Sequence, residues 1–206
     1  MALMVLLMSR VCLVTRLILL LLVPCKLSAG QIMLDDRLRF KESDLFYHHT
    51  ALSYKAVTGK LLTPFAGIRF IQQQGSEWNY FTRFFLGLNL SIKQLPGTLN
   101  LTSAFEFRPG NMLGSLKTSD ELRFRQRFLY RFPFTFSALQ LTPMVFDELF
   151  FRANDNFQYY NNRLGLGIDG KIGQHFRPGI SYYRAFQKSK GWQSDGIIEL
   201  VFKVLF

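Results

Sequence analysis

Residues 121–128 read Glu-Leu-Arg-Phe-Arg-Gln-Arg-Phe, so every second residue is charged and the residues between them are nearly all apolar. Alternation with a period of two places the polar residues on one face of a β-strand and the apolar residues on the other. The same period recurs in residues 98–107 and 163–169. Helical spacing is nowhere better in the body of the chain. The sequence therefore predicts an all-β fold.

Working outward from this stretch, we expect about ten antiparallel strands, within a range of about 8 to 12. They are predicted near residues 33–42, 45–56, 62–72, 77–93, 98–108, 120–132, 136–152, 156–170, 175–187 and 194–206. Several exceed the roughly five or six residues of a soluble strand and match the roughly 9 to 11 that cross a bilayer. Turn-forming residues lie between them, among them Thr58-Gly59, Gln74-Gly75, Pro96-Gly97, Pro109-Gly110, Asn154-Asp155-Asn156, Gly173 and Gly191.

The composition of the two strand faces favours a single antiparallel transmembrane β-barrel over a soluble sandwich. In a membrane barrel the apolar face meets lipid and the polar face lines the lumen. The polar faces here are rich in arginine and also carry Gly87, Gly165 and Gly167, as a narrow interior requires. Aromatic residues gather near predicted strand ends, where interfacial girdles belong. These are Trp78, Tyr80, Tyr159, Tyr160 and Trp192.

The last predicted strand resembles the C-terminal insertion signal of bacterial outer-membrane barrels. Its apolar residues alternate with Glu199 and Lys203, and the sequence ends on phenylalanine. The signal is assigned to Phe202, Val204 and Phe206. The alternative is an ordinary last strand. The signal implies two partners, outer-membrane lipid and the barrel assembly machinery.

Residues 1–30 are interpreted as a secretory signal peptide, with the barrel domain spanning 31–206. The first segment contains basic residues and no acid, an apolar run at 17–24, and small residues at 28–30. We expect translation to begin at Met8, cleavage before Gln31, and export to the bacterial outer membrane. Both cysteines, Cys12 and Cys25, lie in this leader, so the predicted mature chain has none. Lipidation at Cys25 is an alternative.

The predicted mature chain of 176 residues carries 22 basic and 14 acidic residues. This excess fits an anionic partner or, alternatively, charges spread over several faces. We favour the second interpretation and expect no nucleic-acid partner, because no run of Lys and Arg occurs.

Alternation collects a charge network in the predicted lumen. Its members are Arg123, Arg125, Arg127, Arg131, Arg152, Arg163, Glu106, Glu148, Asp169 and Glu199, joined by Arg37, Arg39, Arg69, Arg83, Arg108, Glu121 and Lys203. One interpretation is a cross-linked network that fills a narrow barrel, since buried charges must be paired. The other is an anion-selective path or a site for an anionic ligand. We favour the packed lumen.

The sequence gives little support to a catalytic function or to a metal site. The histidines are His48, His49 and His175, and Ser53 is predicted on the face opposite His48. Adjacent histidines on a strand point to opposite faces and cannot share an ion. We therefore expect no catalytic residue, metal or cofactor.

Part of the chain resembles a known family. The motif Asn161-Asn162-Arg163-Leu164-Gly165-Leu166-Gly167, then Gly179–Tyr183 and the closing strand, is similar to the domain-of-unknown-function 2490 family. Residues 121–131 and 147–151 resemble that family's middle, whereas 31–118 match only in strand rhythm. The resemblance implies an outer-membrane-type barrel and assigns no activity or catalytic residues.

Together these observations predict a monomeric outer-membrane barrel with a structural or ligand-binding role. A small anion-selective pore is the first alternative function, and a lipid-modifying barrel enzyme is the second alternative. Both termini are expected at the periplasmic end, with short connections at 57–60, 94–97, 132–134 and 171–174 and longer ones at 109–119 and 187–193. The connection Pro109–Ser119 is predicted to be extracellular. A hairpin closing near Pro133 would bring Glu148 toward the early part of the arginine strand.

Overall fold

The computed structural model describes residues 30–56, 61–75, 78–93, 96–110, 120–188 and 192–206. They form ten strands: β1 (Gly30–Lys41), β2 (Asp44–Ala56), β3 (Leu62–Gln74), β4 (Trp78–Ile92), β5 (Thr98–Arg108), β6 (Glu121–Arg131), β7 (Thr142–Arg152), β8 (Gln158–Asp169), β9 (Phe176–Lys188) and β10 (Trp192–Leu205). Residues 1–29 of the expected leader, with both cysteines, lie outside these residues, whereas Gly30 is the first residue of β1. No helix in the described ranges is long and apolar enough to cross a membrane.

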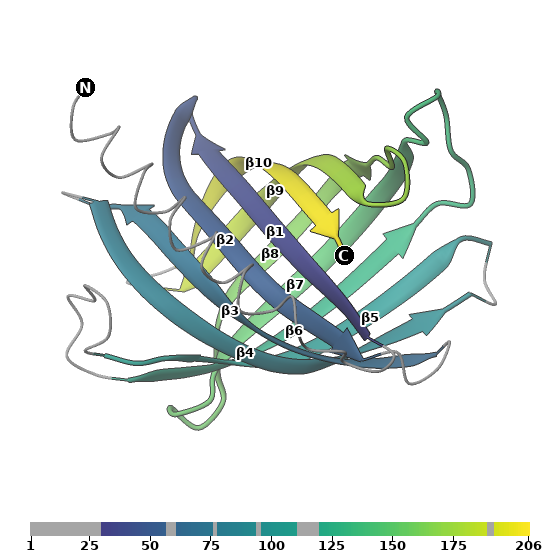
Figure 1. The fold of residues 1–206 in the computed structure, drawn as a ribbon. Coiled ribbons are helices and arrows are strands. Elements are labelled where there is room, and N and C mark those ends of the chain that lie inside the picture. Colours follow the sequence, from purple (N-terminus) through teal and green to yellow (C-terminus); the bar gives the residue numbers. More distant parts are fainter. Residues whose placement is uncertain (1–29, 57–60, 76–77, 94–95, 111–119, 189–191) are drawn as a thin grey trace, which may run out of the picture.

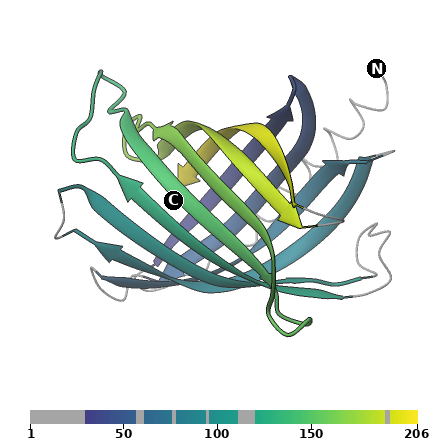
Figure 2. The same cartoon turned by 180° about the vertical axis from the view of Figure 1, so that it is seen from behind.

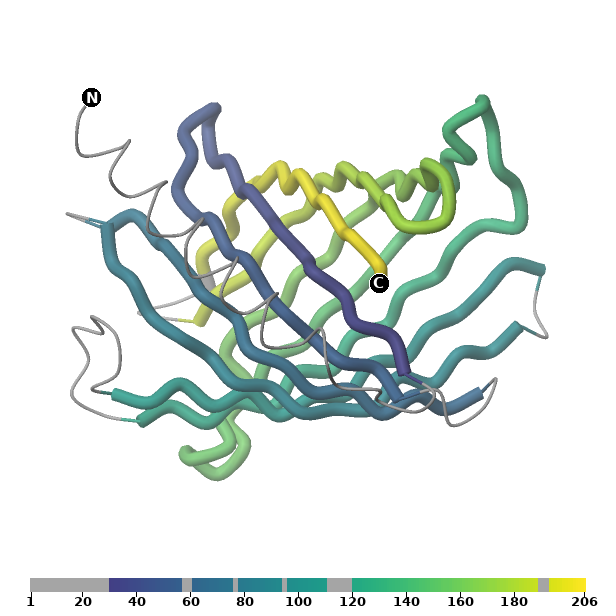
Figure 3. Tube along the Cα trace, in the orientation of Figure 1, coloured from purple at the N-terminus to yellow at the C-terminus, as the bar shows by residue number. Residues whose placement is uncertain are grey.

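The strands form one closed antiparallel barrel in which each pairs with its neighbours in sequence (Figures 1 and 2). Closure is made by β1 and β10, whose ladder runs from Met33 opposite Leu205 to Phe40 opposite Ile198. The even strand number brings the start of β1 and the end of the chain to the same end of the barrel, at the right in Figure 3. We call this the terminal end and the other the distal end. The predicted all-β barrel of ten antiparallel strands is confirmed.

Apolar side chains cover the outside of the barrel, and charged ones lie inside. The outward-facing Leu86 on β4 and Leu164 and Leu166 on β8 are 65%, 58% and 61% exposed. By contrast, the inward-facing Glu106 is 0% exposed. A protein that folds in water does the opposite, since burial of apolar surface drives its folding. The barrel thus has the inverted polarity that the alternation predicts.

Exposed aromatic side chains occur near both ends of the outer surface. Trp78 and Tyr80 lie near the distal end, and Phe202 and Phe206 near the terminal end. The expectation that Tyr160 belongs to a girdle is wrong, because this residue is buried and faces inward. Pairing between β7 and β8 is irregular here: Phe150 is opposite Asn161 and Phe151 is opposite Tyr159. The extra residue, Tyr160, turns into the lumen. The side chain of Trp192 lies outside the described residues.

The predicted start of the seventh strand at residue 136 is wrong. Phe136 and Leu141 bridge each other across a turn, and β7 begins at Thr142. Ser137 and Gln140 adopt positive φ angles of 67° and 47° in this turn, which ends the extended conformation. Local reversals of this kind leave the apolar alternation of the flanking residues intact, so periodicity alone does not detect them.

The predicted alternation of connection lengths is also wrong. The connection from β6 to β7 covers residues 132–141 instead of 132–134, although it lies at the terminal end. At the distal end, β9 and β10 are separated only by residues 189–191 rather than 187–193. The connection Pro109–Ser119 follows β5 at the distal end, and residues 111–119 lie outside the described part of the chain.

Glycines on the inward faces make room for aromatic rings. A Cβ atom at Gly165 would lie 2.7 Å from Cζ of Phe146, and one at Gly87 would lie 2.7 Å from Cζ of Phe65. Both rings therefore lie directly against the barrel wall, where any larger residue would displace them. This close approach lets bulky side chains share the lumen with the charges.

Candidate functional site

The centre of the lumen is a carboxylate surrounded by arginines. Glu106 on β5 contacts Arg69 at 3.4 Å, Arg83 at 3.6 Å and Arg125 at 3.3 Å. Arg123 donates a hydrogen bond from Nε to Glu106 Oε2 at 2.7 Å. Strand pairing creates this cluster, because Arg69 is opposite Arg83 and Glu106 is opposite Arg123. Inward residues on adjacent strands thus meet at one level of the barrel.

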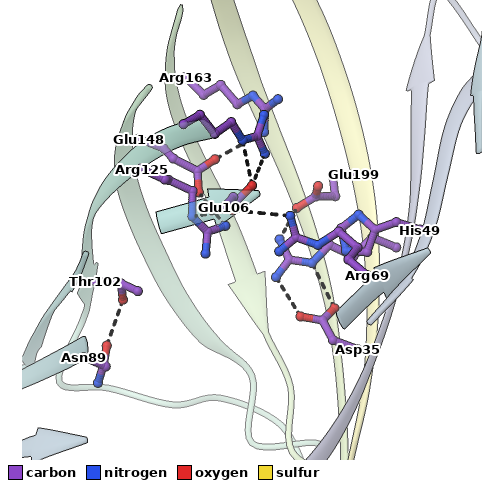
Figure 4. A network of polar contacts seen from close by, with 12 residues as sticks. Asp35, His49, Arg69, Asn89, Thr102, Glu106, Arg125, Glu148, Arg163 and Glu199 are labelled. Atoms are coloured by element: carbon purple, nitrogen blue, oxygen red, sulfur yellow. Dashed lines mark hydrogen bonds and ion pairs between the residues drawn. The ribbon is translucent and has the colours of Figure 1, made fainter. Parts of the chain in front are cut away.

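Arg125 links this carboxylate to a second one (Figure 4). Its Nη1 lies 3.5 Å from Oε1 of Glu148 on β7, whose other oxygen lies 3.3 Å from Nη1 of Arg163 on β8. Residues from β3 to β8 are therefore joined in one network, which we call the central network. It contains Glu106, Glu148, Arg69, Arg83, Arg123, Arg125 and Arg163.

A separate group of charges lies beneath the closure between β1 and β10. Glu199 on β10 contacts Arg39 at 2.5 Å and Arg37 at 3.2 Å. Arg37 also pairs with Asp35 at 2.8 Å. Glu199 is among the predicted lumen charges and Asp35 is not, although Asp35 has the same phase as Arg37 and Arg39. The spacing of two residues from Asp35 to Arg37 places both side chains on the same face of the strand and could have predicted Asp35 in the lumen.

The remaining charges pair nearer the two ends. At the distal end, Glu121 contacts Arg108 at 2.7 Å and Arg83 at 3.3 Å. Near the terminal end, Arg131 contacts Asp169 at 2.6 Å. The distal group is continuous with the central network, because Arg83 contacts both Glu121 and Glu106, whereas the pair of Arg131 and Asp169 shares no ion pair with it in the described part of the chain.

Aromatic rings complete the packing of the lumen. Phe150 lies between Arg163 and Arg123, whose guanidinium carbons are 4.5 Å and 4.9 Å from the ring centroid. Arg127 lies 4.9 Å from the ring of Phe146. Guanidinium groups stack on aromatic faces better than ammonium groups do, which fits the preference for arginine. Sequence analysis did not predict these inward rings, although Phe146 and Phe150 share the phase of Glu148.

Arg152, another predicted member, lies 4.9 Å from the ring of Tyr160. Like Arg127, it takes part in no ion pair within 4.0 Å among the residues that the structure describes. Two arginines of the predicted lumen network, Arg127 and Arg152, therefore contact aromatic rings instead of carboxylates.

The two adjacent histidines point in opposite directions. Nε2 of the outward-facing His48 lies 2.8 Å from Oδ1 of Asp36, which also accepts a hydrogen bond from Thr50 at 2.7 Å. The inward-facing His49 lies 3.2 Å from the hydroxyl of Tyr47. Within the described ranges, no three His, Cys, Asp or Glu side chains are grouped as metal ligands would be.

The register of β6 and β7 corrects one expected contact. Glu148 lies opposite Arg127, in the later part of the arginine strand and not the early part. The reason is the position of the turn: the chain reverses at residues 137–140 and not near Pro133.

Removal of the Glu148 carboxylate tests this arrangement. Glu148→Ala is expected to lower the free energy of unfolding by about 3 kcal/mol, because Arg125 and Arg163 would lose a buried partner. Asp155→Ala, in the exposed connection between β7 and β8, is expected to leave it unchanged. Urea unfolding of the refolded barrel in lipid vesicles measures both. Equal midpoints for the two variants would mean that the inward network does not stabilise the barrel.

Comparison with solved structures finds bacterial barrels of low similarity. The translocator domain of the autotransporter NalP from Neisseria meningitidis aligns with a TM-score of 0.45 and 11% identity, over 86% of this chain and 88% of that one. OccAB3 from Acinetobacter baumannii aligns with a TM-score of 0.31 and 16% identity, over 78% of this chain and 49% of that one.

A comparison with curated proteins finds no match. A family model described as a protein of unknown function (DUF2490) matches residues 25–195. The match extends through the N-terminal half of the chain, where sequence inspection found only a similar strand rhythm. Because it spans most of the sequence, this chain belongs to the DUF2490 family.

Proposed function

We propose that this protein is an outer-membrane β-barrel whose lumen is closed by the central network, and that its role is structural or ligand-binding. The observation that carries the proposal is the complete burial of Glu106 among four arginines. Side chains of Arg69, Arg83 and Arg123 are also largely buried, at 8%, 6% and 11% exposure. Charges packed this tightly leave little room for a hydrated ion.

The outer surface supports insertion into a membrane. Exposed leucine, isoleucine, valine and phenylalanine side chains occur on eight of the ten strands, β3 to β10, or on their flanking residues. Soluble monomers rarely expose contiguous apolar patches larger than a few hundred Å². Export through the predicted leader and assembly through Phe206 complete the proposal. We propose that lipid and the barrel assembly machinery are its partners, and that it acts as a monomer without catalysis.

Barrel dimensions favour the same conclusion. An interior of about eight strands is just wide enough for side chains to fill, whereas open channels occur at about 16 to 18 strands. Ten strands lie close to the lower limit. The arginines, which reach inward from most strands, and the rings between them are large enough to occupy this space.

Planar-bilayer recording tests whether the lumen is closed. We expect the refolded barrel to insert without producing single-channel steps in potassium chloride. The double variant Glu106→Ala with Arg123→Ala serves as the matched control, because it removes side chains from the proposed constriction and is expected to produce steps. Anion-selective steps from the unaltered protein would favour the alternative of a small pore and would contradict the closed lumen.

A further inference from the structure

A large cavity lies in the lumen on the terminal side of the central network. Its volume is about 580 Å³, within the range typical of small-molecule sites. The first residues of β1, including Gln31 and Met33, line it together with Arg177 and Leu205, near the terminal end of the barrel. Arg69 and Arg125 of the central network lie on its inner side. The cavity is thus a pocket whose inner end is closed by the central network.

The wall of this cavity carries a large excess of positive charge. Nine basic and three acidic residues line it. The three acids already have arginine partners, because Asp35 and Glu199 contact Arg37 and Asp169 contacts Arg131. Five further cations have no carboxylate within 4.0 Å among the described residues: Lys55, Arg127, Lys171, Arg177 and Lys203.

Four buried nitrogen atoms in the lining make no hydrogen bond among the described residues. They are Nδ2 of Asn100 and Nε of Arg69, Arg125 and Arg127. A buried donor without a partner costs about 1–3 kcal/mol and is rare in native proteins. An anion in the cavity would supply acceptors for such groups. The repulsion between Arg127 and Lys203 would decrease at the same time.

The cavity also has an apolar side. Ala51, Phe65 and Phe85 belong to a buried cluster on β2, β3 and β4, and all three line the cavity. Arg131, Arg177 and Lys203 come from β6, β9 and β10, on the other side of the closed sheet. Lys55 is opposite Phe65, and the guanidinium carbon of Arg69 lies 5.2 Å from the ring centroid of Phe85, so this side is apolar but also carries charge. A ligand that fills the space would present an anionic group to Arg127 and Lys203 and a partly apolar group to Phe65 and Phe85.

We propose that this cavity binds an organic phosphate, with the phosphate group at Arg127 and Lys203 and the apolar part against Phe65 and Phe85. Five unpaired cations favour a phosphate over a carboxylate, because a phosphate monoester carries up to two charges and three acceptor oxygens. The same group occurs on lipid headgroups and on soluble phosphate esters. The proposal rests on the closed lumen, which makes the cavity a pocket.

Calorimetric titration of the barrel in an uncharged maltoside detergent tests the proposal. The probes are phenyl phosphate as a soluble phosphate ester, dihexanoyl phosphatidic acid, and hexanoate as a carboxylate comparator. We expect one of the two phosphate probes to bind, and the double variant Arg127→Met with Lys203→Met to weaken that binding at least tenfold. Lys188→Met removes one cation at the distal end and is expected to leave binding unchanged.

A structural role for the two cations would give a different result. Because neither has an ion-pair partner in the described ranges, the double variant is expected to unfold at an unchanged or higher temperature. If it does not fold, Lys203→Met alone is used and is expected to weaken binding in the same direction. A destabilised variant with unaltered phosphate affinity would overturn the site.

The remaining outcomes distinguish a lipid headgroup from a soluble phosphate ester, and the phosphate site from the closed lumen. Tighter binding of phosphatidic acid would support a lipid headgroup, and tighter binding of phenyl phosphate would support a soluble phosphate ester. Hexanoate binding as tight as that of either phosphate probe, or no binding of any probe, would overturn the inference. A barrel that binds no phosphate and does not conduct would contradict only this inference, whereas a conducting barrel would contradict the closed lumen.

Discussion

Replacing Glu106 with glutamine is expected to destabilise the refolded barrel by about 5 kcal/mol, the upper end of the range for breaking a buried ion pair. Glutamine has nearly the same shape but no charge, so the substitution creates no cavity. It leaves the positive charges of Arg69, Arg83, Arg123 and Arg125 without the carboxylate that all four contact. Glu148 still contacts Arg125, but the other three would lose their central partner.

Urea unfolding in lipid vesicles, followed by gel mobility of the folded form, measures the effect. Glu42→Gln is the matched control, because Glu42 lies exposed in the two-residue turn between β1 and β2. We expect the control to unfold at the same urea concentration as the unaltered protein. A Glu106→Gln barrel that unfolds with the control would mean that water and neighbouring side chains compensate for the lost charge, and the lumen would not be closed by this network.

Most of the architecture follows from local patterns in the sequence. Alternation in residues 121–128 and in the last strand requires one apolar and one polar face. Pro96-Gly97 and Asn154–Asn156 mark connections that the structure also contains. These signals are local, since each depends on neighbouring residues within one strand or turn. For that reason the ten strands and the direction of their faces could be predicted without any knowledge of pairing.

The partners of the lumen charges depend on pairing, which local patterns do not specify. Glu199 contacts Arg37 and Arg39 only because β1 closes on β10. That pairing joins the two ends of the barrel domain. Likewise, the inward turn of Tyr160 depends on one irregular pair between β7 and β8. A one-residue change in register moves every later side chain to the other face, so such contacts require the assembled barrel.

The division of the lumen into the central network and the cavity also depends on strand pairing, so it could not be predicted from local sequence patterns. Lys55 ends near the same opening as Arg177 and Lys203, although these residues are far apart in the sequence. In the sequence, each of these three residues is an ordinary basic residue near the end of a predicted strand. Their grouping reflects the up-and-down topology, which brings alternate strand ends to one rim. The acids that line the cavity already pair with arginines, so the other cations of the lining keep an unpaired positive charge among the described residues.

Deletion of Phe206 is expected to abolish accumulation of the folded barrel in the outer membrane while leaving its ability to fold in vitro intact. Phe206 is 57% exposed on the outer surface, and its backbone nitrogen donates a hydrogen bond to Ile32 at 2.9 Å. Loss of one such bond costs about 1 kcal/mol, too little to unfold a barrel. A large defect in cells would therefore come from failed recognition by the assembly machinery.

The measurement is the heat-modifiable fraction of the protein in outer-membrane preparations, compared with refolding of the same purified variant into vesicles. Phe206→Tyr keeps a terminal aromatic residue and is expected to assemble normally. Phe136→Ala removes another exposed aromatic side chain, from the connection between β6 and β7, and is expected to have no effect. The deleted protein is expected in the periplasm or as degradation products. Normal outer-membrane levels of folded ΔPhe206 protein would show that the last residue is only the end of a strand, and a parallel loss of refolding in vitro would show that its contribution is to stability.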